Sequence, residues 1–212
     1  MKLYAYDHCP FCAKARMIFG LKSLPLELNY LLENDVDTPT RLVGKKTTPI
    51  LQKAGGSHIA ESMDIVHYID AQHGQPIVTP VVENNPIKVW HDAAWGPILK
   101  LASPRLASAD LPECATPEAR EAFHIRQTGN FGDFNALLND SAQLIQNIEG
   151  QLVALDTLLA GREHVDADDF VLYPSLRMLS IVKGVQYPAN VQRYIERMEQ
   201  ATGVQLHFDQ AR

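Results

Sequence analysis

The opening stretch MKLYAYDHCPFCAKARMIFGLK (residues 1–22) decides the fold, because two cysteines stand where a strand pattern changes to a helix pattern. Residues 2–7 alternate in the way that predicts a β-strand, and residues 10–21 carry apolar side chains at helical spacing. Cys9 and Cys12 therefore flank the start of the predicted helix. They could be metal ligands, a structural disulfide or a reactive pair.

The helix start favours a reactive pair. Pro10 suits the first helical position, because proline has no N–H there to leave without a partner. Cys9 is then the N-cap, where free backbone N–H groups and the positive end of the helix dipole stabilise a thiolate. We expect the pKa of Cys9 to lie below the value of about 8.5 of a free cysteine, which makes it the nucleophile. Cys12, about one turn into the helix and more enclosed, suits a resolving thiol.

The two other uses of the pair are disfavoured. A zinc site needs about four ligands, whereas only His8 lies nearby in sequence and no second CxxC occurs. A structural disulfide between Cys9 and Cys12 would close so short a loop that it would add little stability. We therefore expect redox chemistry without a metal.

Composition sets wider limits. The chain has 212 residues, of which 46% are hydrophobic, enough for a globular core. Its formal net charge is -6 and its basic residues are scattered, which argues against a nucleic-acid partner. No apolar run approaches the roughly 20 residues that span a bilayer, and the N-terminus lacks a signal-peptide pattern. With only three cysteines, we expect a cytoplasmic protein without a membrane partner.

The first part of the chain alternates strands and helices. After the first strand and helix, the pattern predicts a strand at 26–32, a helix capped by Thr38 and ending at Gly44, two short strands at 50–52 and 58–60, and a helix from Ser62 to about His73. The predicted order is β-α-β-α-β-β-α. Prolines at positions 76, 80 and 86 then predict a linker.

Beyond the linker the sequence changes character, and stretches such as 135–159 keep helical spacing. We therefore expect an α/β domain at 1–73, a linker at 74–86 and an all-helical domain at 87–212. Several residues in the helical part are expected to be structural rather than catalytic: Asp166 with Asp169 as a helix-start signal, Trp90 and Trp95 as core, and Cys114 as a spare or buried thiol.

Two further segments are candidates for ligand contacts. A cis Thr48-Pro49 bond would turn the backbone N–H and C=O of Thr48 outward to pair with an extended peptide; alone it would be taken as an ordinary trans proline, and the upstream CxxC favours cis. At the start of the next helix, Ser62 could bind a carboxylate and Glu61 an α-ammonium. The alternative for Glu61 and Ser62 is a plain helix cap.

The three motifs together resemble a known family. CPFC (residues 9–12), TPI (48–50) and ESMDIV (61–66) resemble the N-terminal domain of glutaredoxins and glutathione transferases, and the helical part resembles the transferase C-terminal half. Over the full length the chain is similar to the long bacterial glutaredoxins of the glutaredoxin-2 type. It departs from many glutaredoxins at Phe11, where tyrosine is frequent, and at Thr48, where valine is frequent.

The resemblance implies an α/β thioredoxin-like N-terminal domain plus an all-α glutathione-transferase-like C-terminal domain. It also implies glutathione as co-substrate, held beside the two cysteines. The expected site residues are the catalytic Cys9 and Cys12, the glutathione-binding Thr48, Pro49, Glu61 and Ser62, and the supporting Tyr6, Pro10 and Phe11.

The expected function is that of a glutathione-dependent thiol-disulfide oxidoreductase, a monomer that reduces protein–glutathione mixed disulfides and protein disulfides. One alternative is a cysteine-type glutathione transferase or dehydroascorbate reductase, against which the resolving Cys12 argues. A second is a glutathione-binding or iron-sulfur-carrying module, against which the second cysteine also argues.

Overall fold

The first strand pattern forms an inner strand of a four-stranded sheet. The computed structural model describes residues 1–79 and 85–212. In β1 (Lys2–Ala5), Leu3 and Ala5 are fully buried whereas Lys2 and Tyr4 are only partly buried, as the alternation requires. The sheet order is β2-β1-β3-β4, in which β2 (Glu27–Tyr30) is parallel to β1, and β3 (Ile50–Gln52) is antiparallel to β1 and β4 (His58–Ala60).

Three helices accompany the sheet: α1 (Pro10–Leu21), α2 (Asp37–Val43) and α3 (Ser62–Gln72). The predicted β-α-β-α-β-β-α order is confirmed. The two strands predicted at 2–7 and 26–32 are shorter than expected. The first ends because the N–H of Tyr6 donates to the Cys12 sulfur instead of continuing the sheet ladder.

The start of α2 differs from the prediction. The sequence predicts Thr38 as N-cap and Pro39 as the first helical residue, but the helix begins two residues earlier, at Asp37, and the N–H of Thr38 donates to the side chain of Asp35 at 2.9 Å. Asp35 therefore supplies the capping carboxylate. Gly44 ends the helix in the left-handed conformation (φ 79°), as a glycine after a helix readily does.

The prediction that Pro86 belongs to the linker is wrong. Pro86 is the first residue of α4 (Pro86–Leu106), and the Asn85 side chain accepts the N–H of Ile87 at 2.9 Å. Proline at this position leaves no intrahelical hydrogen bond unmade. Before it, the Asp70 side chain accepts the N–H groups of residues 77 and 78. Pro80 lies outside the described residues.

All regular elements in residues 85–212 are helices, as predicted. The predicted helical stretch 135–159 forms two helices that meet at Asp140. After α4 the elements are η1 (Pro112–Cys114), α5 (Pro117–Phe131), α6 (Phe134–Asn139), α7 (Ser141–Leu158), α8 (Asp169–Leu179), α9 (Ala189–Thr202) and η2 (Phe208–Gln210).

The residues predicted to be structural in this half lie in structural positions, although Trp95 is only partly buried against the core. Trp90 is buried and its indole N–H donates to the Gln151 carbonyl on α7. Cys114 is a buried free thiol in η1. The N–H of Asp166 donates to the Asp169 carboxylate at 2.8 Å, so these two residues do form a helix-start motif, although α8 itself begins at Asp169 rather than just after Asp166.

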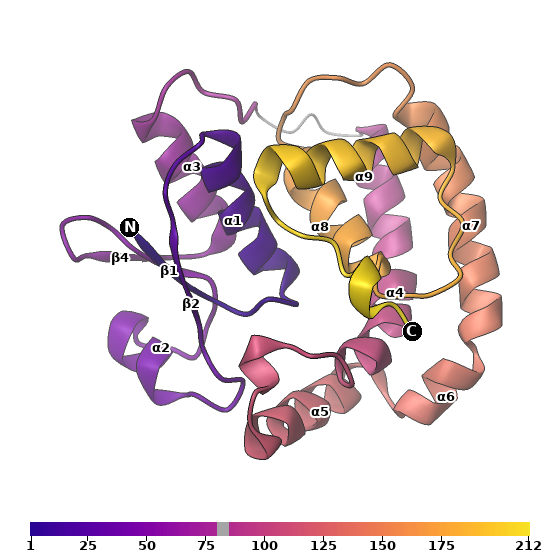
Figure 1. Ribbon diagram of the computed structural model, residues 1–212, viewed down its shortest axis with the longest axis horizontal. Coiled ribbons are helices and arrows are strands. Elements are labelled where there is room, and N and C mark those ends of the chain that lie inside the picture. Colours follow the sequence, from indigo (N-terminus) through magenta and orange to yellow (C-terminus); the bar gives the residue numbers. More distant parts are fainter. Residues whose placement is uncertain (80–84) are drawn as a thin grey trace.

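Helix α1 lies between the two halves of the molecule. It packs against α3 on one side and against α8 and α9 on the other, and Figure 1 shows the sheet and the helical bundle on either side of it. Gly20 makes the closest approach, because a side chain there would meet the backbone of Thr202 at the end of α9. In the part of the chain that the structure describes, no helix combines the length and apolar character needed to cross a bilayer.

Candidate active site

Cys9 is the N-cap of α1, as the sequence predicted. Its backbone is extended (φ -71°, ψ 120°), and the N–H of Cys12 donates to its sulfur at 3.4 Å. The hydrogen bond from the Cys12 side chain, the nearby His8 and the backbone N–H groups of Cys12 and Phe11 outweigh burial and lower the pKa of Cys9 to about 6. Near neutral pH this sulfur is therefore a thiolate.

Cys12 differs from Cys9 in its surroundings. It is fully buried, and its sulfur accepts the N–H of Tyr6 at 3.4 Å. Burial, the hydrogen bond to Cys9 and the charge on Cys9 raise the pKa of Cys12 well above its ordinary value, although a hydrogen bond from Thr48 acts in the opposite direction. Near neutral pH one sulfur of the pair is thus a thiolate while the other keeps its proton.

The Thr48-Pro49 bond is cis, which confirms the prediction. Pro49 is buried at the entry to β3, and Thr48 reaches the Cys12 side chain. The structure therefore brings this bond, distant in sequence, next to the cysteine pair.

Glu61 and Ser62 stand where α3 begins. Ser62 is buried at the first helical position, and Glu61 before it has a positive φ of 71°, which is costly for a residue with a side chain. The exposed Glu61 carboxylate pairs with Lys45 at 2.8 Å. The helix start thus offers free N–H groups and a serine hydroxyl to a carboxylate, beside an accessible carboxylate that can receive a cation.

The supporting residues differ in accessibility. Pro10 occupies the first position of α1. Phe11 is 51% exposed, and the Lys14 ammonium lies 5.3 Å from the centre of its ring. Tyr6 is buried and its ring stacks on His8 at a centroid distance of 5.8 Å, so its side chain is less available to a ligand than expected.

Residues of the helical half hold the turn before Cys9, and sequence reasoning missed them. Arg177 of α8 donates to the carbonyl of Asp7 at 2.6 Å and to its carboxylate at 3.0 Å. Arg16 donates to the same carboxylate at 2.6 Å. Although burial raises the pKa of Asp7, the two guanidinium groups outweigh it and hold this pKa well below the ordinary value. No local pattern could pair Asp7 with Arg177, because they are joined only by packing between the halves.

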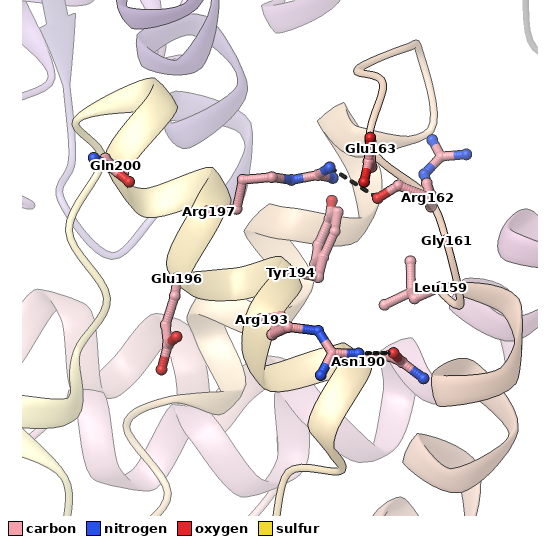
Figure 2. Close-up of a pocket in the computed structure, with 10 residues that line it drawn as sticks. All are labelled: Leu159, Gly161, Arg162, Glu163, Asn190, Arg193, Tyr194, Glu196, Arg197 and Gln200. Atoms are coloured by element: carbon pink, nitrogen blue, oxygen red, sulfur yellow. Dashed lines mark hydrogen bonds between the residues drawn. The ribbon is translucent and has the colours of Figure 1, made fainter.

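A cavity of about 540 Å³ lies away from the cysteines, between α9 and the segment that follows α7. Figure 2 shows its lining, which includes Arg193, Tyr194 and Arg197 of α9. Arg197 donates to the carbonyl of Arg162, and the Tyr194 hydroxyl donates to Asp169. The cavity holds no thiol. Among residues 1–79 and 85–212, no cluster of three or more histidine, cysteine or acidic side chains could hold a metal ion.

Comparison with known proteins gives a consistent result. Residues 3–77 match the family described as "Glutathione S-transferase, N-terminal domain", and residues 86–211 match "Glutaredoxin 2, C terminal domain". Glutaredoxin 2 of Escherichia coli K12 is 44% identical over 97% of this chain and 97% of its own length.

Solved structures agree. Glutaredoxin 2 of Salmonella typhimurium, in complex with glutathione, has a TM-score of 0.95 and 42% identity, covering 100% of this chain and 98% of its own. Gtt2 of Saccharomyces cerevisiae, at 19% identity, has a TM-score of 0.57 and covers 97% of this chain and 100% of its own. This second likeness concerns the fold alone.

Proposed function

The chain belongs to the glutaredoxin 2 family and is a glutathione-dependent thiol oxidoreductase, and we propose that Cys9 is its nucleophile and Cys12 its resolving thiol. The observation that carries this assignment is the Cys9 sulfur at the N-terminus of α1, where backbone N–H groups and the Cys12 side chain stabilise its thiolate. Cys12 lies close enough to exchange with it and is more deeply buried.

Reduction of a protein–glutathione mixed disulfide needs Cys9 alone. The Cys9 thiolate attacks the glutathione sulfur, the disulfide bond breaks, and the protein leaves as a thiolate that takes up a proton. A second glutathione, as its thiolate, then attacks the glutathione sulfur bound to Cys9. Glutathione disulfide leaves and the Cys9 thiolate is restored.

Reduction of a protein disulfide needs both cysteines. Cys9 attacks one sulfur of the substrate and forms a mixed disulfide with it, while the substrate's own disulfide bond breaks and its other sulfur is freed as a thiolate that takes up a proton. Cys12 then gives its proton to the departing protein sulfur and attacks Cys9, so that the substrate leaves as a dithiol and a Cys9–Cys12 disulfide forms. Two glutathione molecules reduce this disulfide.

We expect the rate to follow the ionisation of Cys9. Because the thiolate is the nucleophile, the second-order rate constant for attack of Cys9 on a mixed-disulfide substrate, measured with the substrate in excess, should rise with pH. It should reach half its maximum near the Cys9 pKa of about 6 and then level off. Thiolate absorbance measured against pH should give the same midpoint. A midpoint near that of a free cysteine would refute the assignment of Cys9.

We propose that glutathione binds with its γ-glutamyl end at Glu61 and Ser62 and its backbone along Thr48 and Pro49. The free N–H groups at the start of α3 and the outward edge of the cis bond support this arrangement.

Ser62→Ala should then raise the KM for glutathione roughly tenfold, since a hydrogen bond to a charged group is worth about 1.5–3 kcal/mol. The Cys9 pKa should stay unchanged, which separates lost binding from lost nucleophile activation. The matched control is Ser57→Ala in the exposed turn between β3 and β4, which should leave both quantities unchanged. An unaltered KM in Ser62→Ala would place the tripeptide elsewhere.

We further propose that the protein substrates are glutathionylated or disulfide-containing proteins, that the protein acts as a monomer in the cytoplasm, and that residues 1–73 and 86–212 are its two domains. The separate family matches to residues 3–77 and 86–211 support the division. Assaying a mixed disulfide beside a halogenated arene would distinguish this activity from that of a transferase, and the visible spectrum of anaerobically purified protein would reveal an iron-sulfur cluster.

A further inference from the structure

Glu113, in η1 of the helical half, binds the turn that leads into Cys9. Its side chain is fully buried. One carboxylate oxygen accepts the N–H of Asp7 at 3.0 Å, and the other accepts the N–H of His8 at 2.9 Å. The second oxygen also contacts Nδ1 of the His8 ring. A single carboxylate thus accepts the backbone N–H groups of Asp7 and His8, the two residues that precede Cys9, and also contacts the His8 ring.

Glu113 belongs to a closed network of contacts that also includes His8, Arg126 and Glu33. Arg126 of α5 donates to the Glu33 carboxylate at 2.6 and 3.1 Å, and its Nη2 lies 3.3 Å from His8 Nε2. The N–H of Glu33 donates to the carbonyl of Glu113 at 2.8 Å, which closes the network. Because arginine can only donate, Nε2 of His8 accepts whenever the ring is neutral, and Nδ1 then carries the hydrogen that is donated to Glu113. Glu113 and Arg126 therefore set both the tautomer and the orientation of His8.

The same network of contacts extends to the segment before the cis Thr48-Pro49 bond. The Lys46 ammonium donates to the carbonyl of Glu33 at 2.6 Å, and Lys46 stands shortly before the cis Thr48-Pro49 bond. This network thus contacts both the turn before Cys9 and the segment that leads to the cis bond.

We propose that Glu113 is a positioning residue for the thiol-disulfide reaction, through which the helical half holds the Cys9 sulfur at the N-terminus of α1. It acts through His8 and has no contact with the reacting sulfurs. This inference rests on the proposed role of Cys9.

The geometry explains why a carboxylate is needed at position 113. An amide has only one accepting oxygen, so a glutamine would turn an NH₂ group toward one of the N–H groups of Asp7 and His8. Arg177 also holds Asp7, so this residue stays anchored when Glu113 is changed. The disturbance should therefore concentrate at His8, directly before Cys9.

The test is the Cys9 pKa in E113Q, read from thiolate absorbance against pH and from the pH dependence of mixed-disulfide reduction. The titratable groups whose charges bear on Cys9 are Cys12 and Lys14 of α1 and His8 of the turn. Loss of positioning should raise the Cys9 pKa by about one unit and move both midpoints together. Removal of a negative charge alone would lower it. A lowered or unchanged pKa would overturn the proposal.

The matched control is D156N. Asp156 of α7 is another partly buried carboxylate that accepts backbone N–H groups, those of Asn190 at 2.6 Å and Val191 at 3.3 Å, but it contacts neither His8 nor Glu113. It should lower stability without moving the Cys9 pKa. An equal pKa shift in D156N would show that general destabilisation is the cause and would also overturn the proposal.

Two further results keep the outcome decisive. If E113Q does not fold, the same titration of E113D decides, because that variant keeps the charge but draws the carboxylate back from the Asp7 and His8 N–H groups. A wild-type protein whose Cys9 ionises like a free cysteine refutes the proposed role of Cys9 itself. A low wild-type pKa that persists in the Glu113 variants refutes only the role of Glu113.

Discussion

Cys9→Ser abolishes reduction of both mixed disulfides and protein disulfides in our expectation, whereas Cys12→Ser loses only the second activity. A serine hydroxyl stays protonated near neutral pH and does not attack a disulfide, so no route survives without Cys9. Mixed-disulfide reduction ends with glutathione attacking the Cys9 adduct, a step in which Cys12 takes no part. Two assays on each purified variant, one with a glutathionylated peptide and one with a disulfide-bonded protein, measure the division.

Cys114→Ser is the matched control for these variants. Cys114 is also a buried free thiol, but burial and the charges on Glu113 and Glu33 outweigh two nearby arginines and raise its pKa to about 11, so it is protonated near neutral pH. Both activities should persist in this variant. Equal loss of mixed-disulfide reduction in the Cys9 and Cys12 variants would contradict the proposed roles, because it would make Cys12 essential to a step that needs one thiol.

Gly20→Ala is expected to destabilise the protein strongly. A Cβ at position 20 would lie 1.9 Å from the carbonyl oxygen of Thr202, far inside van der Waals contact. The obstacle is backbone at the end of α9, so relief requires the two helices to move apart. Overpacking of this kind costs about 3 kcal/mol or more. Thermal unfolding should show Tm lowered by roughly 6 to 12 °C.

Gly150→Ala provides the control within the same chain. Gly150 is also inside a helix, α7, but a Cβ there would meet nothing within 4 Å. Alanine should then stabilise the protein by about 0.5–1 kcal/mol, because it restricts the unfolded backbone and favours the helix. Similar Tm values for the two alanine variants would show that α1 and α9 do not pack as closely at Gly20 as the structure indicates.

The local features of the site could be predicted because their causes lie within a few residues. The N-cap position of Cys9 depends on Pro10 and the helical pattern that follows, and the structure places it there. The sequence around Pro49 also suits a trans proline, and only its combination with the CxxC motif favours the cis bond that the structure contains.

Two predictions differ from the structure for local reasons that sequence patterns do not show. The strand predicted at 2–7 ends early because a backbone N–H is taken by the Cys12 sulfur, which is brought back by the helix. The sequence pattern predicts Pro86 in a linker because proline breaks regular structure in general, although proline also suits the first turn of a helix. A composition pattern cannot distinguish these two uses of proline.

The sequence by itself determined that a cysteine caps the first helix, that the order of strands and helices is that of a thioredoxin-like domain, and that a helical half follows. Only the tertiary structure decided that Glu113 and Arg177 hold the turn before Cys9. The physical reason is range: helix capping and side-chain periodicity act within about one or two turns. A buried carboxylate or guanidinium instead takes whichever donors or acceptors the packing of distant segments brings within about 3 Å.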